Sequence, residues 1–251
     1  MRAKYASVRF YGDLGRLAWE ADRFGQAEVT FDVARSVKDV VESCGVPHTE
    51  IELLLVNGES AGFDRLIDDG DRISVFPPFH QLDVEHVSRV RPPPLGEPRF
   101  LLDIHLGRLA GRLRLLGFDC VYGNDDSDER LATVARREQR WLLTRDRGLL
   151  MRSSVTHGYC LRSQVPTQQA VEVVQRFDLA GRLAPFSRCV RCNGLLQEVD
   201  KGAVEHRLEA RTRSLHDEFR ECVSCRRLYW KGSHHPYLTR FVDYVRSSCG
   251  A

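Results

Sequence analysis

Two Cys-x-x-Cys pairs form the most specific chemical pattern in this sequence. Cys189 and Cys192 make the first pair, Cys222 and Cys225 make the second, and 29 residues separate the pairs. Four thiolates complete the tetrahedral site that zinc prefers. Because four protein ligands leave no open position, the spacing predicts a structural Zn²⁺ ion rather than a catalytic one. Two redox-active dithiols are the alternative, which the surrounding sequence does not favour.

Three aspartates stand beside predicted strand ends and helix starts. Asp103 ends an apolar strand, Asp146 follows another strand, and Asp128 starts the helix after a third. Ligands gather beyond the carboxyl ends of parallel strands, so we expect these carboxylates to converge on one edge of a sheet. Like charges repel unless a cation binds, and carboxylates suit Mg²⁺ or Mn²⁺, which activate water in phosphodiester hydrolysis. Alternatively, Asp128 and Asp146 are only helix N-caps.

Short apolar strands alternate with helices through the middle of the chain. Strands are predicted at residues 99–104, 118–122, 140–144 and 158–161. Helices are predicted over 147–151 and 167–177, and from two apolar stripes: Leu106, Leu109, Leu113 and Leu116; and Leu131, Val134 and Ala135. This alternation predicts a parallel sheet with right-handed crossovers.

The first 80 residues have a different order of elements. Strands are predicted at 5–11, 27–33, 51–56 and 72–76, with a helix at 37–44 that Ser36 caps and Gly45 ends. Asn57-Gly58 predicts a tight turn after the third strand. Two strands, a helix and further strands in this order are typical of a β-grasp fold.

This segment resembles the ubiquitin-like sulfur carriers of the ThiS and MoaD kind. Those carriers end in an exposed Gly-Gly whose carboxylate is thiolated, whereas this segment runs on through Val75-Phe76-Pro77-Pro78-Phe79. The difference excludes that sulfur chemistry here. It favours a recognition or scaffold role, with a protein partner for the β-grasp domain.

The runs Phe100-Leu101-Leu102-Asp103 and Leu142-Leu143-Thr144-Arg145-Asp146 belong to a specific pattern in the second part of the chain. With this pattern, the region from residue 99 onward resembles the C-terminal RNase module of the mutator exonuclease family, a relative of PIN-domain nucleases. The resemblance implies a PIN-like fold and a metal-dependent cut of RNA, with acidic ligands at Asp103, Asp128 and Asp146. It places Arg145 beside the metals, where it would hold the scissile phosphate or pair with a carboxylate. The usual fourth acid is Asp126, Glu138 or Asp125. The matching residues are Phe100-Leu101-Leu102-Asp103, Leu106-Gly107-Arg108-Leu109-Ala110, Leu113-Arg114-Leu115-Leu116-Gly117-Phe118-Asp119, Leu142-Leu143-Thr144-Arg145-Asp146 and Tyr229-Trp230-Lys231-Gly232-Ser233-His234.

The expected fold class is therefore α/β with several domains. We predict a β-grasp domain at 1–80, a proline-rich linker at 81–98, a PIN-like domain with a parallel sheet at 99–184, and a zinc ribbon with a C-terminal helix at 185–251. Residues 1–98 hold 11 Lys and Arg against 17 Asp and Glu, whereas residues 99–251 hold 26 against 18. The basic second part predicts a polyanionic partner, and the alternative is a solvated basic surface.

Several cations are candidate RNA contacts. They are Arg108, Arg112 and Arg114 on the helix after the first apolar strand, and Arg226, Arg227 and Lys231 beside the second cysteine pair. Tyr229 and Trp230 stand among these cations and could stack on bases, but we favour Trp230 as the core of the ribbon. Residues 236–247 predict a helix that buries Leu238, Phe241 and Tyr244.

Three functions follow from these patterns. The first is an RNA-cleaving enzyme, and the second is a non-catalytic RNA- or ribosome-associated adaptor, with tRNA among the candidate RNAs. The third makes the β-grasp domain a protein-interaction module. Phosphate-loop, dinucleotide and serine-hydrolase motifs do not occur in the sequence. No long apolar run and no signal-peptide pattern is found, so the expected location is cytoplasmic, away from membranes.

Overall fold

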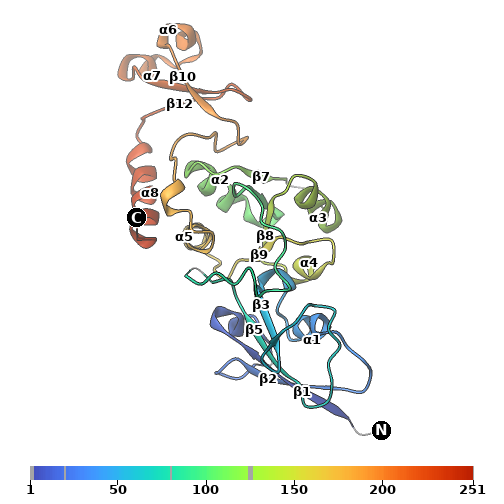
Figure 1. The fold of residues 1–251 in the computed structure, drawn as a ribbon. Coiled ribbons are helices and arrows are strands. Elements are labelled where there is room, and N and C mark those ends of the chain that lie inside the picture. Colours follow the sequence, from blue (N-terminus) through green and yellow to red (C-terminus); the bar gives the residue numbers. More distant parts are fainter. Residues whose placement is uncertain (1–2, 20, 80, 124–126, 251) are drawn as a thin grey trace. The chain divides into compact units, whose positions relative to one another are not determined.

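A computed structural model describes residues 3–19, 21–79, 81–123 and 127–250. The chain divides into two compact units. The first unit comprises residues 1–96 and 128–160, and the second unit comprises residues 97–127 and 161–251. The architecture is the expected one: a β-grasp-like N-terminal sheet, parallel α/β structure in the middle and a small antiparallel C-terminal sheet (Figure 1). The predicted domain boundaries stay a prediction.

The N-terminal sheet is mixed and has the strand order β2-β1-β5-β3-β4. Its central strands β1 and β5 run parallel, and the other neighbours run antiparallel. The elements are β1 (Lys4–Phe10), β2 (Gln26–Phe31), α1 (Val37–Ser43), β3 (Leu53–Val56), β4 (Glu59–Ser60) and β5 (Arg72–Phe76), with 3-10 helices η1 (Gly12–Arg16) and η2 (His48–Glu50).

Local signals set the ends of these elements. The Ser36 hydroxyl accepts from the Asp39 backbone amide at 3.1 Å, and the Asp39 carboxylate accepts from the Ser36 amide at 3.2 Å, which closes a capping box at the start of α1. Hydrogen bonds to the Asp39 carboxylate, the larger effect from the Ser36 hydroxyl and the smaller from the Ser36 amide, lower the pKa of Asp39. Asn57 and Gly58 both have positive φ, as the turn between β3 and β4 requires.

Residues 128–160 belong to the same unit as the β-grasp sheet. They form α3 (Asp128–Arg137), β8 (Trp141–Thr144), α4 (Arg147–Met151) and β9 (Gly158–Cys160). β8 and β9 pair in parallel, from Leu142 opposite Gly158 to Thr144 opposite Cys160. This is the strand–helix alternation that the sequence predicts for the middle of the chain.

Two side chains of η2 join the β-grasp sheet to this segment. The buried Glu50 carboxylate, 1% exposed, accepts from the backbone amide of Cys160 at 2.5 Å. His48 Nε2 lies 2.8 Å from the carbonyl oxygen of Val155. The first unit is therefore held together by specific polar contacts between segments that are about a hundred residues apart in the sequence.

The second unit begins with a parallel strand pair and its helices. The four leucines of the first predicted stripe are all buried, and Gly117 ends their helix with φ +102°. A side chain at Gly117 would meet the carbonyl oxygen of Ala184 at 2.4 Å, so only glycine fits. The elements are β6 (Phe100–Leu102), η3 (Ile104–Leu106), α2 (Gly107–Leu115), β7 (Cys120–Tyr122), α5 (Pro166–Arg176) and η4 (Ala180–Arg182).

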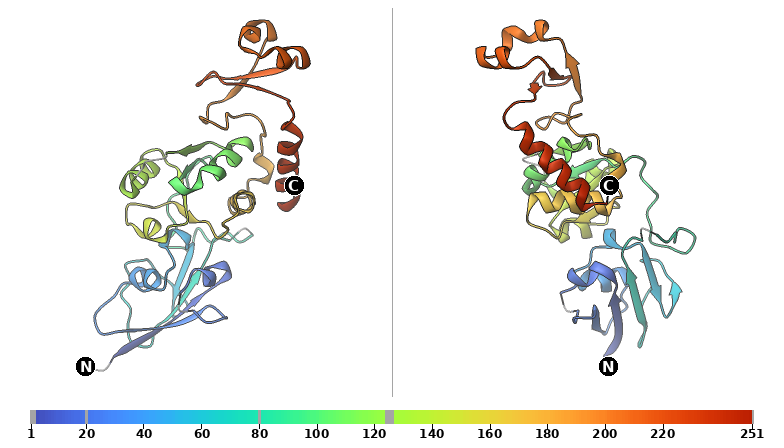
Figure 2. Two further views of the ribbon diagram at one scale, coloured as in Figure 1. Left: turned by 180° about the vertical axis from the view of Figure 1, so that it is seen from behind. Right: turned by 90° about the vertical axis from the view of Figure 1, so that its left-hand side faces the viewer.

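The C-terminal sheet is antiparallel, in the order β10-β11-β12. Between the cysteine pairs, short helices follow β10 and precede β11, and α8 packs against α5 (Figure 2). Within the described residues, no helix combines the length and apolarity needed to cross a bilayer. The elements are β10 (Leu196–Val199), α6 (Lys201–Val204), η5 (Glu205–Arg207), α7 (Ala210–Leu215), β11 (Phe219–Cys222), β12 (Leu228–Trp230) and α8 (His235–Ser248).

Two predicted core positions are wrong. Trp230 is 41% exposed, because Val204 and Leu208 from the long insert cover Phe219 and form the ribbon core in its place. Tyr244 is also 41% exposed. Phe241 is buried as predicted, and Val242 and Val245 complete the buried face of α8.

Candidate metal centre and active-site residues

The four cysteines of the two pairs come together in the second unit. Their sulfur atoms all lie within 4.8 Å of one another. Cys189 Sγ is 3.6 Å from Cys225 Sγ, and Cys192 Sγ is 3.4 Å from Cys222 Sγ. Thiolates on a tetrahedral zinc ion, with Zn–S bonds of about 2.3 Å, would be about 3.8 Å apart. The cluster therefore fits the predicted zinc ion.

The backbone at each pair folds as a zinc knuckle. The amide of Cys192 points at Cys189 Sγ at 3.4 Å, and the amide of Cys225 points at Cys222 Sγ at 3.5 Å. A side chain at Gly194 would lie 2.8 Å from Cys222 Sγ, so glycine keeps the space beside the sulfur open. These amides partly neutralise thiolate charge.

Tyr229 also contacts the cluster. Its hydroxyl lies 3.0 Å from Cys189 Sγ. Burial raises the pKa of the Cys189 thiol, but bonds from the Tyr229 hydroxyl and from the amides of Cys192 and Arg191 outweigh it and lower the pKa to about 6. Burial raises the pKa of Cys192 to about 12, and it also raises the pKa of Tyr229. Tyr229 therefore stays protonated and donates to a thiolate, a role that sequence reasoning missed.

Arg114 anchors the first knuckle. Its side chain is 6% exposed, and its Nε donates to the carbonyl oxygen of Cys120 at 2.9 Å. Its Nη1 donates to the carbonyl oxygens of Val190 and Arg191 at 3.2 and 3.0 Å. The guanidinium is thus engaged inside the second unit rather than presented on its surface.

Asn193 is a second anchor that sequence reasoning missed. Its side-chain oxygen accepts from the amide of Cys120 at 3.0 Å, and its side-chain nitrogen donates to Asp119 at 2.8 Å. Its φ is +73°, a conformation that asparagine tolerates better than most residues. An asparagine directly after a cysteine pair was the available signal.

Asp146 is the N-cap of α4, which was the structural alternative for this residue. Its Oδ1 accepts from the amides of Gly148 and Leu149 at 2.8 and 3.3 Å. Its own amide donates to Thr144 Oγ1 at 2.9 Å. These bonds fix the orientation of an exposed carboxylate directly beyond the end of β8.

Asp128 lies at the same end of the first unit's helix–strand pair as Asp146. Asp128 is the exposed first residue of α3, and only residues 138–140 separate α3 from β8. Gln139 in that link has φ +50°, and α3 packs against β8, so the strand runs back along the helix. The start of α3 and the end of β8 therefore face the same direction.

Glu138 lies at the opposite end of α3. The ten residues of α3 span about 15 Å, so Glu138 and Asp128 are too far apart to share an ion. Glu138 instead accepts from Arg140 at 2.8 Å and from Arg137 at 2.9 Å, and these bonds lower its pKa. The other candidates for a fourth acid, Asp125 and Asp126, lie outside the described residues.

Asp103 belongs to the second unit. It is buried and follows β6, directly before η3. This is the strand-end position that the sequence predicts. The convergence of Asp103 with Asp128 and Asp146 on one rim stays a prediction.

The candidate RNA-contacting cations differ in their surroundings. Arg108 is exposed on α2, and Arg145 is exposed after β8. Arg112 lies over the ring of Phe241, with its guanidinium carbon 4.7 Å from the ring centroid. In the ribbon, Arg227 is exposed, Arg226 lies 3.0 Å from Glu221, and Lys231 lies 2.6 Å from Glu218. The Lys231–Glu218 pair lies on the surface and is therefore weak, so Lys231 can exchange partners, whereas Arg226 pairs with a carboxylate that is only 2% exposed.

Comparisons with known proteins agree with this organisation. A model of the Mut7-C ubiquitin domain matches residues 3–83, and a model of the Mut7-C RNAse domain matches residues 98–242. A comparison with curated proteins found no match. The crystal structure of SAMP1 from Haloferax volcanii is similar at 18% identity over 30% of this chain and 97% of that chain, with a TM-score of 0.24, which is too low to carry an argument. Because the RNAse-domain match spans more than half of the 251 residues, the chain belongs to the Mut7-C RNase family.

Proposed function

We propose that this chain is a ribonuclease that depends on Mg²⁺ or Mn²⁺ held by Asp103, Asp128 and Asp146. The observation that carries the proposal is the RNAse-domain match, which encloses all three aspartates. The common end that Asp128 and Asp146 occupy in the first unit supports it as well. Oxygen ligands of this kind suit hard divalent cations.

The residues around the aspartates have distinct roles in this proposal. Metal ions bound there would activate a water molecule and stabilise the leaving oxygen of a phosphodiester bond. The amides of Gly148 and Leu149 hold the Asp146 carboxylate, and Thr144 Oγ1 accepts from the Asp146 backbone amide. Arg145, next to it, orients the scissile phosphate through its planar guanidinium.

We propose that RNA reaches this site across a basic surface. Arg108, Arg112, Arg226, Arg227 and Lys231 would contact backbone phosphates. Arg114 is omitted because its donors bind backbone carbonyls. The four cysteines would hold a structural zinc ion that keeps the ribbon cations in position. Since a thiolate cluster needs reduced cysteines, we propose a cytoplasmic location.

Substitution of Asp103 by asparagine tests the enzyme proposal. Asp103→Asn keeps the shape of the side chain but removes its charge, and we expect cleavage of RNA to fall at least about a hundredfold, or about 3 kcal/mol of transition-state stabilisation. Asp178→Asn is the matched control, because Asp178 is exposed and has φ +50°, which asparagine adopts readily.

Metal removal gives an independent test. EDTA should abolish cleavage, and added Mg²⁺ or Mn²⁺ should restore it, whereas added Zn²⁺ alone should not. Cleavage by Asp103→Asn at the rate of the control would contradict the metal mechanism. Binding of RNA without cleavage by the wild-type protein would favour the RNA- or ribosome-associated adaptor.

We also propose that the β-grasp domain contacts a protein partner. Trp19 and Phe24 are large, exposed aromatic side chains on this domain, and such residues are enriched in interfaces. A double substitution to serine should remove a partner recovered with the wild-type protein. Recovery of the same partner by the double variant would exclude this surface.

A further inference from the structure

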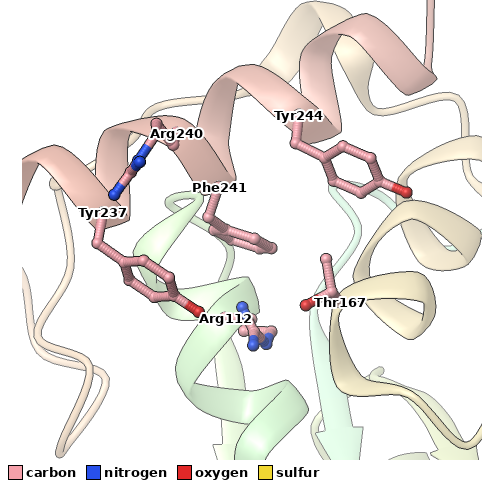
Figure 3. A pocket seen from close by; sticks show the side chains of 6 residues that line it. All are labelled: Arg112, Thr167, Tyr237, Arg240, Phe241 and Tyr244. Atoms are coloured by element: carbon pink, nitrogen blue, oxygen red, sulfur yellow. The ribbon is translucent and has the colours of Figure 1, made fainter.

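A hollow in the second unit is lined by side chains from three helices. Its volume is about 280 Å³, close to the lower end of the range for ligand pockets. Figure 3 shows Tyr237 and Phe241 projecting from α8 toward Arg112, and Tyr244 projecting toward α5, while Arg240 lies along α8. The lining residues are Arg112, Thr167, Tyr237, Arg240, Phe241 and Tyr244.

The hollow carries positive charge that the protein does not neutralise locally. Arg112 is held over Phe241, and no carboxylate is among the lining residues. Within the described part of the chain, Arg240 has neither an ion-pair nor a hydrogen-bond partner. Arg246 on the same helix differs, since it lies 4.0 Å from Asp243. Two guanidinium groups without acid partners suit a phosphate.

The aromatic residues of the hollow are open to solvent. Tyr237 is 58% exposed and has room to stack on a flat ligand. Tyr244 is more constrained, because Gln168 Nε2 donates to its hydroxyl at 2.8 Å. Thr167 lies in the first turn of the eleven-residue helix α5, whose N-terminal end carries partial positive charge.

We propose that this hollow binds one nucleotide of single-stranded RNA. The phosphate would lie between Arg112 and Arg240, and the base would stack on Tyr237. Stacking on an aromatic side chain needs a base that is not already stacked in a duplex, so the site selects single strands. The inference rests on the proposed function, which supplies RNA as the substrate, and it adds a substrate class and a subsite.

Binding measured by fluorescence anisotropy tests the subsite. The probe is a labelled 12-nucleotide single-stranded RNA in buffer without added divalent metal, with its integrity checked on a gel. Arg240→Ala should weaken binding about fivefold at 0.1 M salt and lower the salt slope by about 0.7, as expected for one phosphate contact. Tyr237→Ala should weaken binding at least about fivefold, as expected for one stacked base.

Three controls separate the possible sources of the effect. Arg246→Ala, on the same helix but outside the hollow, should bind as the wild type does. A blunt duplex of the same sequence should bind wild type and Tyr237→Ala equally. AMP should compete only weakly with the labelled RNA for the protein. If AMP displaced the RNA at a concentration equal to that of the RNA nucleotides, the assignment of the hollow to an RNA chain would be overturned.

Wild-type affinity in both Arg240→Ala and Tyr237→Ala would also overturn the proposal. The assay reads binding rather than turnover, so its outcome is separable from that of the cleavage tests. Weaker binding by both variants, with no cleavage by the wild type, would keep the subsite and remove the ribonuclease. Unchanged binding by both variants, with cleavage by the wild type, would remove the subsite and keep the ribonuclease.

Discussion

Glu50→Ala should destabilise the first unit by breaking the contact between the β-grasp sheet and β9. The Glu50 carboxylate is buried and accepts from the amide of Cys160 at 2.5 Å. Alanine would leave this buried amide without that acceptor, and loss of a hydrogen bond to a charged group costs about 1.5–3 kcal/mol. For a chain of this size, about 2 kcal/mol corresponds to a fall of ~4–8 °C in the melting temperature.

Thermal unfolding followed by circular dichroism measures this change. Glu28→Ala is the control, because Glu28 is exposed on β2 and its loss should change stability by at most about 0.5 kcal/mol. Hydrogen exchange adds a local readout, since the amide of Cys160 should lose protection in Glu50→Ala only. Equal melting temperatures for the two variants, with unchanged protection at Cys160, would refute the argument that Glu50 joins the two segments.

Three further predictions concern the cysteine cluster and Glu138. Cys225→Ser should reduce the zinc content measured by mass spectrometry from one ion per chain toward none, whereas Cys249→Ser, outside the cluster, should retain the ion. Glu138→Gln should leave the rate of RNA cleavage within about twofold of the wild-type rate, because Glu138 lies at the far end of α3 from Asp128. A loss of cleavage as large as that expected for Asp103→Asn would instead make Glu138 the fourth metal ligand. Hydrogen bonds from Arg140, and to a smaller extent from Arg137, lower the pKa of Glu138 in the folded protein. The pairing therefore stabilises the protein fully at pH values above the unfolded pKa, near 4.5, and this stabilisation is lost as the pH falls through the lower pKa of the folded state. The stability difference between Glu138→Gln and the wild type should therefore be full at pH 7 and shrink in acid.

Elements that depend on local chemistry could be predicted from the sequence. The capping box at Ser36, the Asn57-Gly58 turn and the helix end at Gly117 all agree with the structure, because each depends on residues only a few positions apart. The cysteine cluster could be predicted for a similar reason. Ligand type and the two-residue spacing define each half of the site without reference to the rest of the fold.

Features that depend on distant segments could not be predicted. From its position in the helix, Arg114 could equally be an arginine that faces solvent. It is a buried anchor only because the loop with Cys189 and Cys192 folds over it. Trp230 is 41% exposed although its ring centroid lies 6.2 Å from that of Phe219, and the buried ribbon core consists of Phe219 with Val204 and Leu208 of the insert. Nothing in the local sequence shows that Val204 and Leu208, which precede Phe219 by 15 and 11 positions, will cover it.

The chain that follows β5 is bonded back onto the β-grasp domain. After β5 ends at Phe76, the amide of Phe79 donates to the Glu52 carboxylate at 2.7 Å, and the Ser88 hydroxyl donates to the Glu52 carbonyl oxygen at 2.5 Å. The position at which a sulfur carrier has its free carboxylate is therefore occupied by chain that is held against the domain. With Glu50 bonded to β9, the residues that lead into β3 hold both this returning chain and β9. The chemistry of a carrier needs a mobile, free tail, which this arrangement does not provide, whereas the contacts of His48 and Glu50 with residues 128–160 fit the proposal that the domain holds Asp128 and Asp146 in place.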